Sequence, residues 1–182
     1  MKDTVAGKLD GNEIPAWLLG ELRSDQAGET GAVAIYQGIL WVSRDAKIRH
    51  FAKHHLRTEK SHLSKINSVI PENSRSRLLP LWRAAGFVTG ALPSLFGASA
   101  IYATIAAVES FVDEHYLQQI ERLDREQLFP TLRELLADCR EDEIHHKQEA
   151  EQALGARPQL ALRAWCRIVD FGSRIAVAIE RR

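Results

Sequence analysis

The sequence predicts an all-α protein: a ferritin-like four-helix bundle with a hydrophobic crossover helix and a C-terminal amphipathic helix. Three observations support this fold class. Apolar residues recur at alternating steps of three and four, which is the repeat of a buried helical stripe. No run alternates at period two over enough residues to indicate a strand. Glutamates and histidines interrupt the apolar stripes in a pattern that repeats between the two halves of the chain.

The end signals place the four bundle helices in order. Pro15 suits the first position of a helix, Asp45 can cap the second, and Gly155 ends the fourth. A turn-rich stretch, IPENSRS, follows the second helix, and LDREQLFP connects the third to the fourth. The expected helices cover about residues 15–43, 45–69, 99–123 and 131–154.

The composition is that of a single domain over residues 1–182, in which we expect residues 1–13 to be flexible. This length can bury a substantial core. Twenty-four basic and 24 acidic side chains balance, so no net field would attract nucleic acid. Cys139 and Cys166 form no paired motif, which favours a reducing compartment. The N-terminus resembles neither a secretory signal nor a transit peptide, so we expect a bacterial cytosolic setting.

Two copies of Glu-x-x-His lie on the buried stripes of the second and fourth helices. They are Glu59 with His62 and Glu143 with His146. One helical turn separates the members of each pair, so both side chains point inward. A buried carboxylate beside a buried imidazole must be paired or bind a metal ion. One isolated copy would be an ordinary surface feature, but two copies favour a metal site.

The first and third helices each carry one further glutamate on the apolar stripe, Glu29 and Glu109. A Glu-x-x-His pair begins 30 residues later in the first half and 34 residues later in the second. A tyrosine also follows each lone glutamate by seven residues, Tyr36 and Tyr116. These matching intervals indicate an internal repeat of two helices.

This set of residues is the constellation of di-iron carboxylate bundles, in which two helices give one glutamate and two give Glu-x-x-His. Carboxylates with imidazoles suit two iron or manganese ions rather than a thiolate-type zinc site. Four carboxylates would also neutralise two divalent ions. The predicted metal ligands are Glu29, Glu59, His62, Glu109, Glu143 and His146.

Five further side chains lie close to these ligands along the same helices and are candidates to orient them: Tyr36, Tyr116, Asp25, Asp113 and Asp142. Each aspartate is one turn from a ligand, which for Asp142 is His146. Ordinary bundle packing is the alternative for the tyrosines.

The hydrophobic stretch 78–108 contains one charged residue, Arg83. It is longer than the ~20 residues that span a bilayer, but glycines and a proline break it, and Glu109 follows directly. We therefore predict that residues 78–97 lie in a membrane interface or line an apolar tunnel, with a plain buried connection as the alternative. The side chains expected to meet a membrane or an apolar substrate tail are Trp82, Phe87, Leu95 and Phe96.

Residues 157–182 alternate apolar side chains, including Trp165, with arginines. A basic amphipathic helix with tryptophan is typical of an interfacial anchor. A fifth packing helix that covers the bundle is the alternative, and the two interpretations are compatible.

Five blocks resemble the signature blocks of the demethoxyubiquinone hydroxylase family of ubiquinone biosynthesis: SDQAGETGAVAIYQG, EKSHL, LLPLWRAAGFVTGALPSLFG, AAVESFVDEHY and CREDEIHH. The resemblance covers about residues 20–180, and by these motifs the same six residues would be the iron ligands. In one departure, Gln26 stands where the family usually has histidine within Asp-His-Ala-Gly-Glu. Gln26 is not among the ligands, so the predicted site is retained.

The resemblance implies a di-iron, O2-dependent monooxygenase that hydroxylates the ring of a prenylated benzoquinol, demethoxyubiquinol. A polyprenyl tail cannot be handled in water, so we expect peripheral association with the cytoplasmic side of a bacterial inner membrane. The family allows NADH as the electron source, although no Gly-rich dinucleotide loop is present. A homo-oligomer and a lipid-binding partner protein are left open.

Two alternatives use the same fold. One is a ferritin-like ferroxidase or iron store, against which the hydrophobic crossover argues because a store needs a polar, shell-forming surface. The other is a related quinone hydroxylase that acts at another ring position.

Overall fold

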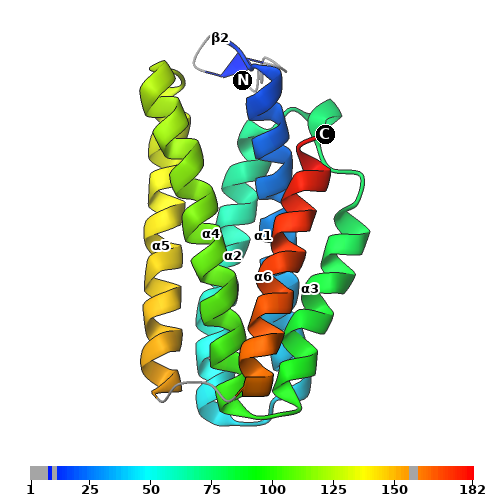
Figure 1. Cartoon of the computed structure of the whole chain (residues 1–182). Coiled ribbons are helices and arrows are strands. Elements are labelled where there is room, and N and C mark those ends of the chain that lie inside the picture. Colours follow the sequence, from blue (N-terminus) through cyan, green and yellow to red (C-terminus); the bar gives the residue numbers. More distant parts are fainter. Residues whose placement is uncertain (1–7, 10–11, 156–159) are drawn as a thin grey trace.

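The computed structural model describes residues 8–9, 12–155 and 160–182 (Figure 1). Within these residues the protein is all-α apart from one very small strand pair. The six helices are α1 (Ala16–Val42), α2 (Ala46–Val69), α3 (Leu79–Ser94), α4 (Ala98–Glu126), α5 (Pro130–Leu154) and α6 (Leu160–Glu180). A 3-10 turn, Glu72–Ser74, follows α2. Helices α1, α2, α4 and α5 form a four-helix bundle, consistent with the ferritin-like class.

The helix ends follow local chemistry. Asp45 caps α2, because its side chain accepts hydrogen bonds from the backbone N–H groups of Lys47 (2.8 Å) and Ile48 (3.1 Å). Gly155 ends α5 with a positive φ of 68°, a conformation that costs glycine little. Pro15 precedes α1 as its N-cap rather than occupying its first helical position.

One short antiparallel pair joins β1 (Lys8–Leu9) to β2 (Asn12–Glu13). The expectation that no strand forms is therefore wrong at this point, because two residues are too few for an alternating pattern to be visible. Most of the segment 1–13, which we expected to be flexible, lies outside the described residues.

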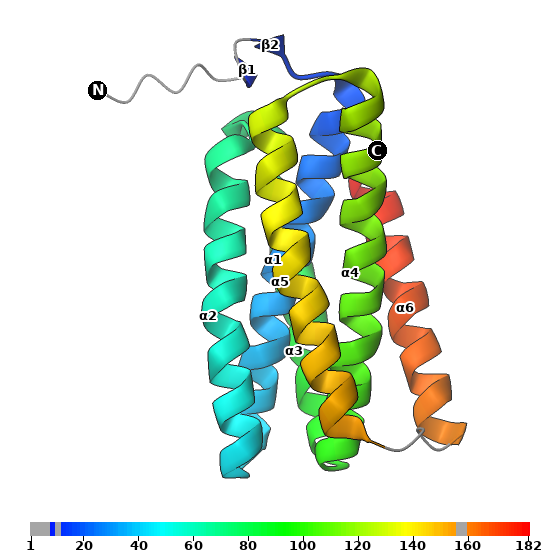
Figure 2. The same cartoon turned by 90° about the vertical axis from the view of Figure 1, so that its left-hand side faces the viewer.

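Helices α3 and α6 cover one side of the bundle (Figures 1 and 2). Helix α3 packs along α1, whereas α6 lies across both α1 and α4. The indole Nε1 of Trp165 on α6 donates to Thr104 Oγ1 on α4 at 2.9 Å. None of the described helices combines the length and apolarity needed to cross a membrane.

Glycines allow α3 to lie directly against the backbone of α1. A Cβ atom added to Gly86 would collide with Gly31, and one added to Gly90 would collide with the backbone of Ile35. Helix α3 runs unbroken through both glycines and through Pro93. The expectation that these residues break the segment is therefore wrong, and the break falls only between α3 and α4, where Gly97 has a φ of 92°.

The buried apolar side chains form two clusters, one toward each end of the bundle. Leu22 on α1 belongs to one cluster and Ile35 to the other, and on α5 Cys139 and Ala150 are divided in the same way. The polar residues of the apolar stripes lie between the two clusters, at mid-height in the bundle.

Candidate metal centre

All six predicted ligands lie inside the bundle, and none is more than 3% exposed. Helices α1 and α4 each contribute one glutamate, and α2 and α5 each contribute a glutamate and a histidine. On α5, Glu141 and Glu151 lie off the apolar stripe and are exposed. The helical spacing therefore assigned the inward face correctly.

The six residues form two overlapping groups, in each of which one ligand atom per residue lies within 4.8 Å of the others. The first group is Glu29, Glu59, His62 and Glu143, and the second is Glu59, Glu109, Glu143 and His146. Glu59 and Glu143 belong to both groups, whereas each other residue belongs to one. Two ions with two shared carboxylates would fit this arrangement.

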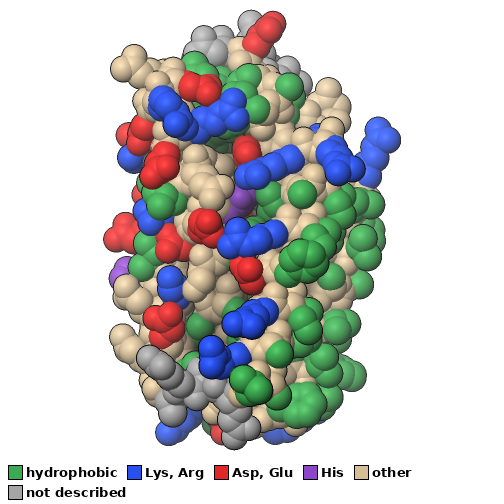
Figure 3. Space-filling view, viewed as in Figure 1, with side chains coloured by type: hydrophobic (Ala, Val, Ile, Leu, Met, Phe, Trp, Pro, Cys, Tyr) green, Lys and Arg blue, Asp and Glu red, His purple; other side chains and the backbone are tan. Residues whose placement is uncertain are grey.

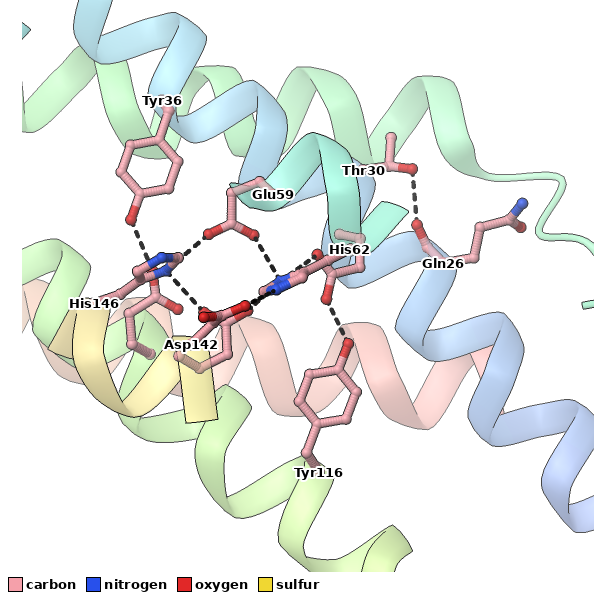
Figure 4. A network of polar contacts seen from close by, with 11 residues as sticks. Gln26, Thr30, Tyr36, Glu59, His62, Tyr116, Asp142 and His146 are labelled. Carbon is pink, nitrogen blue, oxygen red and sulfur yellow. Dashed lines mark hydrogen bonds and ion pairs between the residues drawn. The ribbon is translucent and has the colours of Figure 1, made fainter. Parts of the chain in front are cut away.

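The two histidines direct Nδ1 toward the carboxylates (Figure 4). His62 Nδ1 lies 3.0 Å from Glu143 Oε1. His146 Nδ1 lies 3.1 Å from Glu59 Oε1 and 3.2 Å from Glu143 Oε2. These are ion-pair distances, but His146 Nδ1 is not in hydrogen-bond geometry with either oxygen. In both groups Nδ1 is therefore the nitrogen available to a metal ion.

Burial makes the carboxylates costly to ionise without a metal. Burial, followed by the neighbouring Glu143, raises the pKa of Glu29 to about 7 and that of Glu59 and Glu109 well above the ordinary value. Burial also opposes ionisation of Glu143, but hydrogen bonds with His146 and His62 outweigh it and lower its pKa to about 2. The cluster therefore favours an added positive charge.

Several buried atoms of the cluster have no hydrogen-bond partner among the described residues. They are both carboxylate oxygens of Glu59, one oxygen each of Glu29 and Glu143, and Nδ1 of His146. Buried polar atoms of folded proteins are normally paired. Carboxylate oxygens with imidazole nitrogens suit iron or manganese, so this donor set fits two such ions.

The two tyrosines bind the lone glutamates crosswise. Tyr36 of α1 donates to Glu109 Oε1 of α4 at 3.0 Å, and Tyr116 of α4 donates to Glu29 Oε1 of α1 at 2.5 Å. Each tyrosine thus holds the glutamate of the other half of the repeat rather than that of its own helix. These hydrogen bonds fix the carboxylates from outside the cluster.

The three candidate aspartates have different positions. Asp142 Oδ2 lies 3.0 Å from Nε2 of His62, rather than contacting His146 as its position on α5 suggested. Asp25 Oδ1 accepts from Gln119 Nε2 at 2.7 Å and lies 3.0 Å from His115 Nε2. Asp113 accepts from Arg140 Nε at 2.7 Å. For Asp25 and Asp113, orientation of a ligand stays a prediction.

The sequence interpretation missed the role of His55, although His55 lies on the buried stripe of α2. Its ring packs against that of His146, with the centroids 4.1 Å apart and the planes at 72°. Nε2 of His55 lies 3.0 Å from Glu149 Oε2. Burial, together with the neighbouring His146 and His54, lowers the pKa of His55 to about 3, which keeps its imidazole neutral.

A cavity of about 390 Å³ leads to the four glutamates from the side covered by α3 and α6. Its wall is mainly apolar and includes Ile35, Trp82, Val108, Phe111, Trp165 and Val169. Trp82 was expected at a membrane surface, but it is half-buried and its indole Nε1 donates to Glu180 Oε1 at 2.5 Å. Phe87 is also half-buried, whereas Leu95 and Phe96 are 68% and 75% exposed.

Comparison with known proteins decides the family. The model of the family described as ubiquinone biosynthesis protein COQ7 matches residues 16–180. The chain belongs to the COQ7 family. A 3-demethoxyubiquinol 3-hydroxylase of Rhodospirillum rubrum is 35% identical over 186 residues, covering 100% of this chain and 86% of the relative.

Two further COQ7 relatives agree. A 3-demethoxyubiquinol 3-hydroxylase of Ralstonia pickettii is 33% identical, covering 82% of this chain and 71% of its own. A human protein, NADPH-dependent 3-demethoxyubiquinone 3-hydroxylase, mitochondrial, is 31% identical, covering 88% of this chain and 76% of its own.

The one departure from the family motif, Gln26, lies away from the cluster. Its Nε2 donates to Asn67 Oδ1 at 2.7 Å, and its Oε1 accepts from the backbone N–H of Ser76 at 2.9 Å. Gln26 therefore joins α1 to α2 and to the loop before α3. In this member of the COQ7 family the changed position supports the packing of the bundle.

We expect metal-free Glu109→Gln protein to be more stable than metal-free wild type near neutral pH. The folded-state pKa of Glu109 lies above its ordinary value of 4.5, so folding takes up a proton above that pH and the wild type loses stability as the pH rises. Glutamine avoids this loss and still accepts a hydrogen bond from Tyr36.

Thermal unfolding with a chelator measures this effect. The difference in Tm should be present at about pH 7 and vanish below about pH 4, where the glutamate is protonated in both the folded and unfolded states. Added Mn²⁺ should raise the Tm of the wild type more than that of the variant. A variant that is less stable than the metal-free wild type at neutral pH would contradict the expectation.

Proposed function

We propose that this chain is a 3-demethoxyubiquinol 3-hydroxylase, an O2-dependent di-iron monooxygenase that acts on the ring of a prenylated benzoquinol in ubiquinone biosynthesis. The observation that carries the proposal is the apolar cavity that ends at four buried glutamates. Such a cavity suits an apolar ring beside a metal centre. The names of the Rhodospirillum rubrum and Ralstonia pickettii relatives support this substrate.

The six buried glutamates and histidines would hold two iron ions, with Glu59 and Glu143 shared between them. Iron in this position supplies the activation of O2 that hydroxylation requires. The chain itself holds the carboxylates in place through Tyr36 and Tyr116. Its apolar cavity wall excludes water and brings the ring next to the glutamates.

An iron store or ferroxidase is the first alternative. It would need an entry path lined by polar or acidic groups, whereas the cavity here is lined mainly by aliphatic and aromatic side chains. A hydroxylase acting at another ring position is the second alternative. The relatives' names specify position 3, and identification of the product distinguishes the two positions.

The function is tested in cells that lack this protein. They should accumulate the demethoxy quinone, and the wild-type chain should restore ubiquinone whereas Glu59→Ala should not. Purified protein should contain about two iron ions per chain and hydroxylate a short-chain demethoxyubiquinol, with NADH and NADPH compared as electron sources. Full activity of metal-free protein, or a product hydroxylated elsewhere on the ring, would refute the proposal.

Peripheral membrane association follows from the surface of α3 and α6. Hydrophobic side chains gather over these helices (Figure 3). The outer apolar face consists of Leu81, Val88, Leu92, Leu95, Phe96, Ile168, Phe171 and Ile175, all exposed. Arginines 163, 167 and 174 on α6 are exposed as well and can meet anionic head groups. We place the protein on the cytoplasmic side of a bacterial inner membrane, where this face could alternatively receive a second copy or a lipid-binding protein.

Replacing Leu95 and Phe96 together by serine should release the protein from anionic phospholipid vesicles without loss of iron. Both side chains lie at the end of α3, far from the cluster in sequence, and their exposure removes no packing from the core. Co-sedimentation and metal analysis measure the two effects. The control is the double change Glu141→Ser and Glu151→Ser on α5, which should leave binding unchanged. Equal binding by both double variants would locate the membrane contact elsewhere.

A further inference from the structure

The two halves of the internal repeat are not equivalent around the metal centre. A shift of 84 residues relates Glu59 and His62 to Glu143 and His146. The same shift relates Asp142, which precedes Glu143, to Thr58, which precedes Glu59. The ligands are thus repeated, but the carboxylate next to them is present in one half only.

The unmatched carboxylate contacts a histidine ligand. Asp142 Oδ2 of α5 lies 3.0 Å from Nε2 of His62 on α2, and the His62 side chain is fully buried. Asp142 accepts the Nε2–H, so Nδ1 faces Glu143, Glu29 and Glu59 (Figure 4). A carboxylate in this place fixes the ring and makes the imidazole a stronger metal ligand.

His146 has a different neighbour. His55 packs its ring edge against the His146 ring, and its repeat counterpart near His62 is Cys139. This contact restricts the orientation of His146 but brings no negative charge to it. Thr58, the counterpart of Asp142, is half-buried and carries no charge.

We propose that the two metal positions are unequal and that Asp142 makes the position of Glu29 and His62 the tighter one. The inference rests on the dimetal centre of the proposed function and adds to it an order of binding. The first ion occupies the Glu29 and His62 position, and the second occupies the Glu109 and His146 position. Asp142 acts as a positioning residue through His62.

The test is a stepwise titration of metal-free protein with Co²⁺, followed by calorimetry and by the visible absorption of the bound ion. The wild type should show two steps of different affinity. Asp142→Ala should weaken the tight step by about 10–100-fold and leave the weak step unchanged. Asp142→Asn should fall between the two, because the amide oxygen accepts the same hydrogen bond without the charge.

Two further variants complete the design. Asp138→Ala removes an exposed aspartate one turn earlier on α5 and should change neither step. Thr58→Asp places a carboxylate at the repeat counterpart and should tighten the weak step toward the tight one. Circular dichroism and Tm of each metal-free variant verify folding.

Two equal steps in the wild type would overturn the proposal, as would equal weakening of both steps by Asp142→Ala. These outcomes are separate from the proposed function. A protein that hydroxylates demethoxyubiquinol but binds two Co²⁺ ions equally would refute only the inequality. Unequal steps without any hydroxylation would refute only the enzymatic proposal.

Discussion

Glu59→Ala and Glu143→Ala should each remove most of the bound iron and abolish hydroxylation, whereas Glu29→Ala and Glu109→Ala should each retain about one of about two iron ions. The reason is that Glu59 and Glu143 belong to both groups of ligands, while the other two glutamates belong to one group each. Loss of a shared carboxylate leaves two adjacent cations insufficiently neutralised. Glu29→Ala and Glu109→Ala should resemble each other, since they are repeat counterparts, and both should be inactive.

Elemental analysis and quinol hydroxylation measured side by side test this ranking. Glu141→Ala is the matched control, because Glu141 lies on α5 beside the cluster but is exposed, and such changes usually stay within roughly 0.5 kcal/mol. Glu149 is unsuitable as a control because it pairs with His55. Iron loss in Glu141→Ala with iron retained in Glu109→Ala would show that the inward face of the helices is misassigned. Equal iron loss in all four glutamate variants would contradict the distinction between shared and unshared ligands.

The sequence was sufficient to select the buried polar residues. A glutamate on an apolar stripe is anomalous, and its direction relative to its own helix follows from 3.6 residues per turn. The rotation and axial offset between helices do not follow from that periodicity. For this reason the crossed hydrogen bonds of Tyr36 and Tyr116, and the contact of Asp142 with His62 instead of His146, could be seen only in the structure.

The crossover helix shows a second limit of sequence reasoning. Glycine and proline lower helix propensity, so residues 78–97 were interpreted as interrupted. In the structure the glycines face the backbone of α1, and close packing outweighs the local propensity. Trp82 illustrates the same limit, because its exposure depends on the position of Glu180, which is 98 residues away in the chain.

Gly90→Ala should destabilise the protein, whereas Gly28→Ala should stabilise it. Both glycines lie inside helices, where alanine is intrinsically favoured by about 0.5–1 kcal/mol. A Cβ atom at Gly28 would meet no atom within 4 Å, so the favourable term remains. A Cβ atom at Gly90 would collide with the backbone of Ile35, and such overpacking typically costs about 1–3 kcal/mol. The collision therefore outweighs the propensity gain.

The consequence of Gly90→Ala should extend to the substrate cavity, because α3 forms one of its walls. Helix α3 can relieve the collision only by moving away from α1, since the opposing atoms are backbone atoms that cannot rotate aside. We expect a higher KM for the quinol with unchanged iron content, because the metal ligands lie on other helices. Denaturant unfolding gives the change in stability, and steady-state kinetics gives KM. If Gly90→Ala were as stable as Gly28→Ala, α3 would be free to shift without cost, and its close contact with α1 would not define the cavity.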